Sequence, residues 1–565
     1  MEAKRSSRFQ KTQCSRQSLA QSPSFPNGAI RLEGILQDVE APLSRDASSP
    51  SAKFILLAAL LLSIPALLPL GGALIVPYLN NRVPTGFIEY DLPSYLAEGR
   101  AYFDPGFHLT YGNPYAGYDT PVIYFQPQTI LLGLMQQLGF DPGVTFNCFG
   151  LLALFFAAVV AVRFYIEVVG AETTAKRIGL VCFFWGGGIF TLVGLALALA
   201  RGHTLSTLWQ FEPTWGWWML NFGRNLVYPT EAYYHGVFLL SILFLFRRQL
   251  APCLTCAALL CCSHPFSGLE LILILIAYSA VELVLRSGAV TFKFLFGSSL
   301  IAALHMAYYM IWLNRFSDHR ILQLQWQKAW LYRPKTIVGA LIIVGCLAIW
   351  RLASSSFSRL NDPRNRLFAV WFLVIIALTQ HQLVMRPLQP IHFAHGYDWM
   401  ALFFLGSPAL IELLDSVLRK PRPLVRMGAL ALIVGILLLD NTAWLIKTAV
   451  HNEFLVLLSR DESDALGWLS QHLRSGDMVI CQDTVISYLV PVYSQARAWQ
   501  GHEKNTPYLL QRRAEIERAF SQGLLLPEWK RKGVVYVSPA AWSPPAGILL
   551  EQRYGNSEFS IWTVP

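Results

Sequence analysis

Two carboxylates stand close together in a polar stretch that begins a few residues after a long apolar run. Glu89 and Asp91 lie in the segment 86–97, and the apolar run before it ends at Leu79. In an extended backbone, residues two apart project to the same side, so both carboxylates can hold one divalent cation or flank one reacting hydroxyl. Two adjacent acids also raise one another's pKa, which suits a general base. An ordinary solvated turn is the alternative interpretation.

A second set of residues has the chemistry to bind phosphate. Arg386 is followed closely by His392 and His395, and Arg224 lies in another polar stretch of the chain. Phosphate oxygens require cationic or hydrogen-bonding partners, which these four side chains can supply. They are therefore candidate phosphate-binding residues.

The histidine pair has two further interpretations. His392 and His395 are spaced i, i+3, which metal ligands can use. Tyr397 and Trp399 follow directly, and aromatic side chains of this kind anchor loops at a membrane interface. The pattern therefore fits either a site or an interfacial anchor.

The elements that must position these residues are apolar runs of bilayer-spanning length. Of the 565 residues, 54% are hydrophobic and only 14% are charged, whereas a soluble domain is about one-quarter charged. A run of roughly 20 apolar residues spans a bilayer as a helix. About eleven runs qualify, over approximately 54–79, 143–167, 177–200, 233–249, 250–262, 267–285, 292–313, 336–353, 367–385, 397–418 and 425–446.

The run 250–262 is the least certain of these spans. It is short, and Pro265 and Gly268 interrupt the hydrophobicity after it, as in a broken or half-depth helix buried among neighbours. If it crosses, the basic clusters at 176–177, 247–248, 359–366 and 419–426 fall on one side, which is then cytoplasmic together with the N-terminus. The basic residues between 315 and 335 fall on the other side and break this rule. The loop 80–142 and everything after Lys447 then face outward. If it does not cross, these two regions lie on opposite sides.

The chain divides into three parts. Residues 1–52 are polar and without periodicity, which predicts a disordered cytoplasmic tail. Residues 53–449 form the transmembrane domain, with the long first external loop 80–142 and a surface-lying helix at 129–138. Residues 450–565 form a small α/β domain, predicted from helical patterns at 463–474 and 507–520 and strand patterns at 477–481 and 533–538.

The net charge of +10 does not indicate nucleic-acid binding. The basic residues fall in small clusters beside apolar runs and never form a long stripe interleaved with aromatic residues. Gly186 to Gly188 lie inside a predicted span and lack the strand and lysine of a phosphate loop, so direct nucleotide use is disfavoured. The fold class is therefore an all-α polytopic membrane protein with a small C-terminal extramembrane α/β domain.

This layout resembles the GT-C superfamily of membrane glycosyltransferases. Members have a cytoplasmic N-terminus, an acidic motif at the start of the first external loop, and an aromatic-proline segment that leads into an amphipathic helix ending in glycine. The corresponding features are Glu89-Tyr-Asp91, Tyr124 to Pro127, and Gly139. Members more often carry two consecutive prolines where this chain has Gln126-Pro127. The segment 497–507 resembles the external domain of bacterial members.

The resemblance implies a hexosyl- or pentosyltransferase of the inverting type in the cell (inner) membrane. Its donor would be a sugar on polyprenyl phosphate, and its acceptor a lipid, a glycan or a protein at the external face. Asp91 matches the family's catalytic aspartate, the base that deprotonates the acceptor hydroxyl, while Glu89 would assist or help bind Mg²⁺ or Mn²⁺. Tyr90, Tyr124 and Tyr397 are predicted to line the substrate site.

Two other functions compete with this one. A transporter or flippase for a lipid or small molecule requires polar residues deep within spans or an internal repeat, and the sequence has few of the former and no repeat of useful length. A non-catalytic scaffold that displays the C-terminal domain predicts that Glu89 and Asp91 are dispensable.

Overall fold

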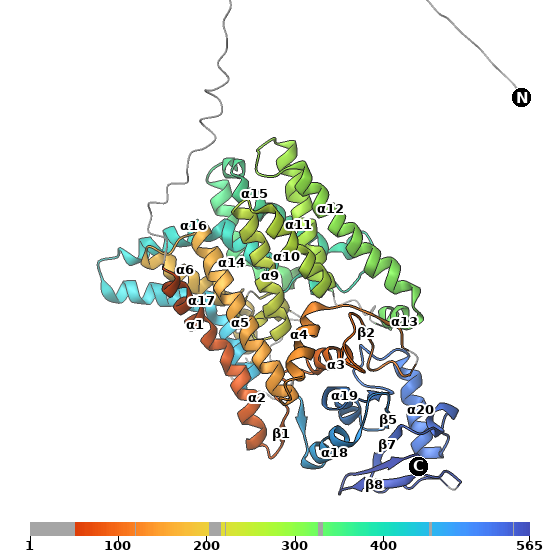
Figure 1. The fold of residues 1–565 in the computed structure, drawn as a ribbon. Coiled ribbons are helices and arrows are strands. Elements are labelled where there is room, and N and C mark those ends of the chain that lie inside the picture. The colour runs from red at the N-terminus through yellow and green to blue at the C-terminus, as the bar shows by residue number, and fades with distance from the viewer. Residues whose placement is uncertain are drawn as a thin grey trace, which may run out of the picture. The chain divides into compact units, whose positions relative to one another are not determined.

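The computed structural model describes residues 51–118, 120–202, 216–220, 222–325, 331–450, 455–545 and 547–565. Residues 1–50, which make up nearly all of the predicted tail, lie outside the described residues. From Ser51 onward the described chain is a bundle of apolar helices followed by a smaller domain built around a sheet (Figure 1). The predicted class, a polytopic helical protein with a C-terminal α/β domain, is confirmed.

Each predicted apolar run forms a helix or a pair of helices. In chain order these are α1 (Ala52–Ser63) with α2 (Leu67–Leu79), α5 (Pro142–Val168), α6 (Thr174–Trp185) with α7 (Phe190–Ala200), α9 (Pro229–Phe246), α10 (Leu250–Ser263), α11 (Pro265–Val284), α12 (Phe292–Met306), α14 (Pro334–Ala353), α15 (Pro363–Thr379), α16 (Tyr397–Leu418) and α17 (Pro423–Val450). Short helices α8 (Phe222–Asn225) and α13 (Ser317–Gln325) lie in the connections.

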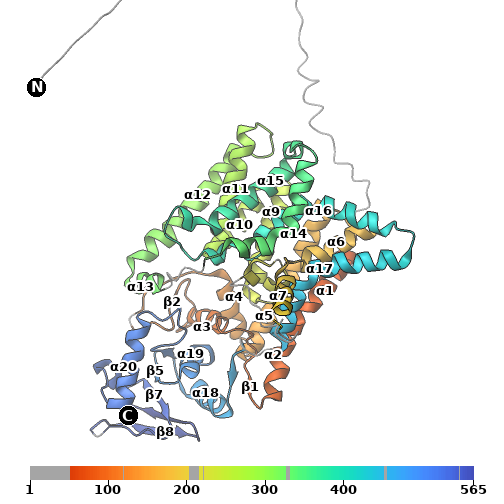
Figure 2. The ribbon, with the colours of Figure 1, turned by 180° about the vertical axis from the view of Figure 1, so that it is seen from behind.

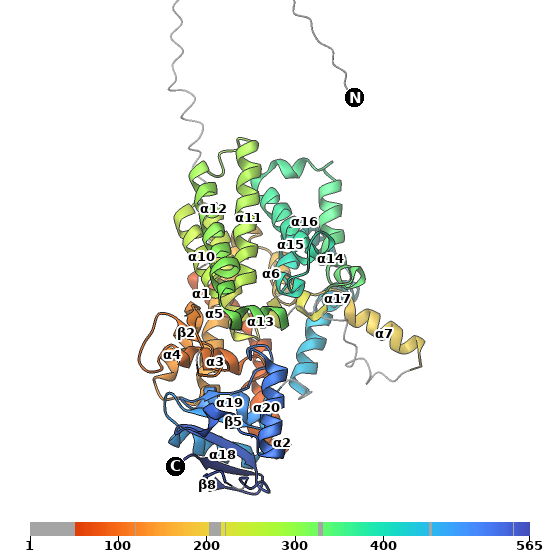
Figure 3. The ribbon, with the colours of Figure 1, turned by 90° about the vertical axis from the view of Figure 1, so that its right-hand side faces the viewer.

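Seven helical segments in the described chain are long and apolar enough to cross a membrane, or eight if α6 and α7 form one broken span. Those two helices are bent by 69°, and α7 points away from the other helices in Figure 3. Helices α9, α10 and α15 fall outside this set; α10 has only 14 residues and α15 has 17. They pack within the bundle, so neighbouring helices cover them.

The two ends of the bundle differ in chemistry. At one end, Arg247 after α9 pairs with Glu167 of α5, and Arg366 of α15 pairs with Glu282 of α11 at 2.6 Å. At the other end, Gln128 Nε2, from the first loop, donates to the Ser263 carbonyl at 2.9 Å. The end of α10 therefore lies on the face of the first loop, so α10 carries the chain back to that face despite its shortness.

The first loop, 80–142, folds into a compact cap at that end. It contains β1 (Val83–Pro84), α3 (Pro93–Ala101), β2 (Tyr111–Gly112), β3 (Val122–Tyr124) and α4 (Pro127–Gln136). Helix α4 is the surface helix predicted at 129–138, and Gly139 follows with a φ of +81°. Helices α3 and α4 pack closely at Gly99 and Gly133. A Cβ on Gly133 would lie 2.2 Å from the Gly99 carbonyl oxygen, so only glycine permits this approach.

The C-terminal domain is a five-stranded sheet in the order β6-β5-β7-β9-β8. Strands β5 (Met478–Cys481), β6 (Arg497–Ala498) and β7 (Val534–Pro539) are parallel, and β8 (Glu551–Gly555) and β9 (Phe559–Thr563) are antiparallel. Its helices are α18 (Arg460–His472), α19 (Thr484–Tyr493) and α20 (Leu509–Gln522). The strands and helices predicted from periodicity correspond to β5, β7, α18 and α20.

The C-terminal domain is joined to the first loop through the backbone. Strand β4 (Leu457–Leu458) pairs antiparallel with β1, and Thr85 Oγ1 donates to the Val456 carbonyl at 2.6 Å. Figures 1 and 2 show the domain beside α3 from opposite sides. The first loop and the C-terminal domain therefore lie at the same end of the helical bundle.

Candidate functional site

The acid pair lies in the turn that leads into α3. Phe87 and Ile88, just before it, are buried, and Phe87 packs on Phe146 of α5 with ring centroids 5.6 Å apart. The Leu92 N–H donates to the Glu89 carbonyl, and Pro93 begins α3, where proline's missing N–H costs nothing. The backbone at the acid pair is a turn, as in the alternative interpretation, and not the extended conformation that would project both carboxylates to the same side, because the start of α3 turns the chain at these residues.

Both oxygens of Asp91 are bound by the C-terminal domain. His502 Nε2 lies 2.7 Å from Oδ1, and Lys504 Nζ donates to Oδ2 at 2.9 Å. An ionised carboxylate only accepts, so His502 Nε2 carries the hydrogen. Burial alone would raise the pKa of Asp91, but the hydrogen bond and charge of His502, together with Lys504, outweigh it and hold the pKa well below its usual range.

Glu89 has a different electrostatic setting. Its pKa is raised to about 7, first by burial and then by the negative charge of Asp91. Arg224 and Lys504 oppose this increase, and Glu231 adds to it, so all four charged groups lie within electrostatic range of Glu89. A carboxyl with a pKa near neutrality can accept and release a proton under physiological conditions.

Arg224 is buried in an aromatic cage. Its guanidinium carbon lies 3.7 Å from the ring centroid of Trp218, 4.5 Å from that of Tyr228 and 6.0 Å from that of Trp444. Its Nη1 donates to Asn225 Oδ1 at 3.1 Å. Aromatic faces stabilise a cation, so the cage holds the guanidinium in place within electrostatic range of Glu89.

The two predicted histidines lie beside this cage. His395 Nδ1 lies 2.8 Å from Glu231 Oε2, and the His395 ring is 4.9 Å from Trp218. The ring centroids of His392 and His395 are 5.6 Å apart. The structure therefore brings both histidines to the neighbourhood of Arg224.

The remaining predicted residues are more dispersed. Tyr90 is partly exposed and stacks on His502 at 5.1 Å, so it borders the acid pair. The Tyr124 hydroxyl lies 3.3 Å from His319 Nδ1, and Tyr397 is buried and stacked on His235. Arg386 is exposed in the loop after α15, and its part in a phosphate site stays a prediction.

The arrangement does not fit a resident divalent cation at the acid pair. Among the described residues, no group of three or more His, Cys, Asp or Glu side chains is placed to hold a metal ion. Both oxygens of Asp91 also face positively charged or N–H donors, which a cation would have to displace. No chemical step is therefore assigned to Mg²⁺ or Mn²⁺.

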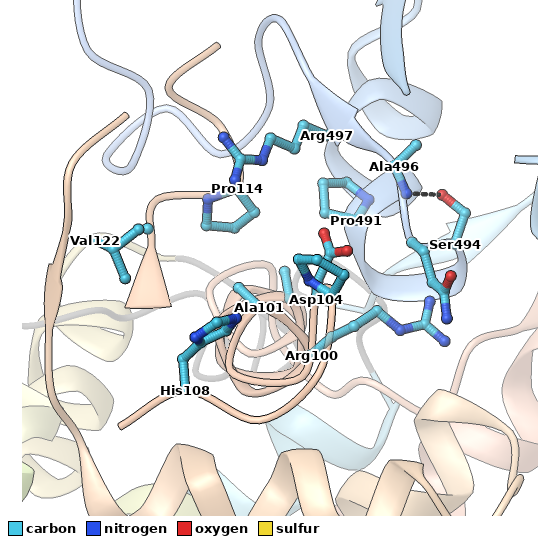
Figure 4. A pocket seen from close by; sticks show the side chains of 14 residues that line it. Arg100, Ala101, Asp104, His108, Pro114, Val122, Pro491, Ser494, Ala496 and Arg497 are labelled. Carbon is cyan, nitrogen blue, oxygen red and sulfur yellow. Dashed lines mark hydrogen bonds between the residues drawn. The ribbon is translucent and has the colours of Figure 1, made fainter. Parts of the chain in front are cut away.

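A separate cavity of about 210 Å³, lined by both apolar and charged side chains, lies between α3 and the C-terminal domain (Figure 4). Arg100, Asp104, His108 and Arg497 line it, together with Ser494 and other residues of the segment 491–497. Neither acid of the pair lines this cavity. It is distinct from the site around Glu89.

Three charged or ionisable residues of this site were missed in the sequence. His502 and Lys504 are more than 400 residues from Asp91 in the chain, and Glu231 begins α9, where it resembles an ordinary acidic residue at a helix start. A signal was present only for the first two, because they fall in the segment 497–507, which resembles the external domain of bacterial GT-C members.

Comparison with known proteins gives structural similarities only. No protein-family model matches the sequence, and no curated protein matches it. ArnT from Cupriavidus metallidurans, in a structure bound to undecaprenyl phosphate, is 10% identical with a TM-score of 0.44, covering 89% of this chain and 98% of ArnT. The oligosaccharyltransferase from Archaeoglobus fulgidus, in complex with Zn and sulfate, is 12% identical with a TM-score of 0.39, covering 85% and 68%. At these scores neither similarity identifies a function.

Proposed function

We propose that the chain is an integral membrane glycosyltransferase of the GT-C type, which transfers a sugar from a polyprenyl-phosphate carrier to an acceptor hydroxyl at the external membrane face. The observation that carries the proposal is the acid pair Glu89 and Asp91 on a loop at the end of the bundle, with the cations Arg224 and Lys504 close to Glu89. A proton acceptor beside cations at the membrane edge suits attack of an acceptor hydroxyl on the anomeric carbon of a lipid-linked sugar phosphate, with the phosphate as leaving group.

The reaction is a single displacement. The acceptor hydroxyl oxygen attacks the anomeric carbon, the bond from that carbon to the phosphate oxygen breaks, and the electron pair leaves with polyprenyl phosphate. The acceptor proton passes to a carboxylate of the pair. One displacement inverts the configuration at the anomeric carbon, as the resemblance implies. A lipid-linked donor reaches this site by lateral diffusion in the bilayer.

The contacts favour Glu89 over Asp91 as the proton acceptor. Asp91 is held ionised by two donors, which weakens it as a base, whereas Glu89 has a pKa of about 7. The resemblance implied the opposite assignment. We therefore assign Glu89 as the base and Asp91 as the residue that orients the turn and balances nearby positive charge.

The developing charge on the phosphate requires cationic partners. Arg224 is a suitable one, because its planar guanidinium can donate several hydrogen bonds to phosphate oxygens while it stacks in its cage. His392 and His395 lie beside it and can supply further hydrogen bonds. Arg386 remains a candidate at the exposed edge.

One observation favours the second candidate, a lipid or small-molecule transporter. Glu270 of α11 is fully buried, and in the described part of the chain neither of its carboxylate oxygens has a hydrogen-bond partner. Buried acids inside membrane helices often mark ion or proton pathways. If transport were the function, Glu270→Gln would abolish substrate flux in proteoliposomes while Glu89→Gln would leave it unchanged.

The proposed function is tested by glycosyl transfer in membranes supplied with polyprenyl-phosphate sugars. The native chain, Glu89→Gln, Asp91→Asn and the exposed-acid control Glu517→Gln are compared. We expect the control to match the native chain and Glu89→Gln to lose at least about a hundredfold in rate, which is typical for removal of a general base. Absence of transfer with every donor would refute a glycosyltransferase, and native rates in both pair variants would refute the acid pair as the source of the base.

A further inference from the structure

The C-terminal domain reaches the acid pair with one short loop. This loop, 501–506, follows β6 and carries both His502 and Lys504. Each donor meets a different oxygen of Asp91, at 2.7 Å and 2.9 Å. The carboxylate is therefore fixed in direction as well as in charge.

The loop itself is held rigidly. Thr506 Oγ1 accepts from the Gly501 N–H at 3.0 Å and donates to the His502 carbonyl at 2.9 Å. A Cβ on Gly501 would lie 2.2 Å from the Tyr115 ring, so this backbone lies flush against the first loop. The ring of His502 is buried near Tyr90 and Tyr488, at centroid distances of 5.1 Å and 5.2 Å.

The domain also fixes the main chain on both sides of Asp91. The Tyr488 hydroxyl of α19 donates to the Tyr90 carbonyl at 2.5 Å and accepts from the Ser94 N–H at 3.0 Å. Because Tyr90 links the two acids, a constraint on its carbonyl constrains Glu89 as well. Three side chains of the C-terminal domain, those of Tyr488, His502 and Lys504, thus hold residues 90–94 of the first loop.

We infer that the C-terminal domain completes the catalytic site, with His502 and Lys504 as positioning residues that hold Asp91 and, through it, the neighbouring Glu89. This inference rests on the proposed function and deepens it. The domain is then a required part of the transferase and not an appended module. His502 and Lys504 can affect the transfer rate in this way without contacting the substrate.

The charge of Lys504 gives the inference a distinctive readout. The charged groups within range of Glu89 are Asp91 beside it, Arg224 of α8, Glu231 of α9 and Lys504 of the domain. Lys504 lowers the pKa of Glu89, so its removal raises that pKa and a higher pH is needed to ionise the base. A purely structural residue would lower the rate without moving the pH profile.

The experiment measures transfer against pH for the full chain in membranes. Lys504→Gln should lower the transfer rate at pH 7 at least about tenfold. It should also move the acidic limb of the pH–rate profile to higher pH, by at least about half a pH unit. Lys504→Arg keeps the positive charge, so the acidic limb of its pH–rate profile should lie at the same pH as in the native chain. His502→Phe keeps an aromatic ring but removes the donor and should lower the rate, whereas His502→Gln should retain part of it. Exposed Lys532→Gln and His472→Gln are the matched controls.

Hydrogen exchange of residues 86–98 and the unfolding transition are recorded on the same samples. Faster exchange in this segment with an unchanged unfolding transition supports local positioning. Native rates and profiles in Lys504→Gln and His502→Phe would overturn the inference while leaving the proposed function intact. Lost activity without a shifted profile, or with global unfolding, would also overturn it. No transfer by the native chain would instead overturn the proposed function.

Discussion

At the residue scale, the site separates two carboxylates that look equivalent in the sequence. Asp91 is held ionised by the donors of His502 and Lys504, and Glu89 is raised toward neutrality by burial and by Asp91. Pairs of acids whose surroundings push their pKa values apart commonly divide the tasks of a reaction. Here the division supports the proposed role of Glu89 in proton transfer.

This division predicts how the transfer rate depends on pH. The base must be ionised, and the pKa of Glu89 is about 7, so the rate should rise through pH 7 and level off about one unit above it. The measurement is kcat/KM for transfer between pH 5 and pH 9 in membranes. If Asp91 were the base, its low pKa would leave the rate flat over this range.

The sequence predicted several site residues but not the contacts between them. Glu89, Asp91, Arg224, His392 and His395 were selected by residue type and position, and the structure brings all five to one region. The spacing of residues within one short segment could be read from the sequence, because neighbours in the chain are also neighbours in space. No local pattern relates Asp91 to Lys504, because their contact depends on how the C-terminal domain packs on the first loop.

At the element scale, the position of the acid pair depends on the packing of α3 against α4. Gly99 and Gly133 face one another there, and neither position has room for a Cβ. The short apolar segment 129–138 predicted α4, but the long segment between α3 and α4 separates Gly99 from Gly133 in the chain, so the contact between the two helices was not visible in the sequence. Glycines at a helix contact are visible in a sequence only when their partner is known.

We predict that Gly133→Ala destabilises the first loop. The new Cβ would lie 2.2 Å from the Gly99 carbonyl oxygen, and overpacking of this kind costs about 1–3 kcal/mol. Gly467→Ala in α18 is the control, because nothing lies within 4 Å of a Cβ there and alanine favours helix. Proteolysis of the first loop and the unfolding transition measure the difference. Equal stability of the two variants would contradict the packing of α3 on α4.

At the scale of the whole molecule, the segments predicted to be external lie together at one end of the helical bundle. The first loop contacts the C-terminal domain, the end of α10, and Tyr308 after α12, whose hydroxyl donates to the Ile123 carbonyl at 2.9 Å. The basic ends of α9 and α15 lie at the other end of the bundle, paired with acids of α5 and α11. The apolar runs and the basic clusters at their ends predicted which segments lie at each end of the bundle. Both features can be read directly from the sequence, without knowledge of the contacts.

The orientation in the membrane gives a further prediction. The basic end should be cytoplasmic, so single cysteines at Gly476 of the C-terminal domain and Gly288 between α11 and α12, in a cysteine-free background, should differ in access. A membrane-impermeant maleimide should label Gly476→Cys in intact cells and Gly288→Cys only after permeabilisation. Labelling of both positions from one side would contradict the predicted orientation, which places Gly476 and Gly288 on opposite sides of the membrane.

The central claim is that this chain moves a sugar from polyprenyl phosphate to an acceptor hydroxyl with Glu89 as base. The most direct measurement reconstitutes the purified chain in liposomes with labelled polyprenyl-phosphate sugars and follows free polyprenyl phosphate and glycosylated acceptor together. We predict equal amounts of the two products from the native chain, and at least about a hundredfold less of both from Glu89→Gln. Undiminished formation of both products by Glu89→Gln, or none by the native chain with any donor, would contradict the account.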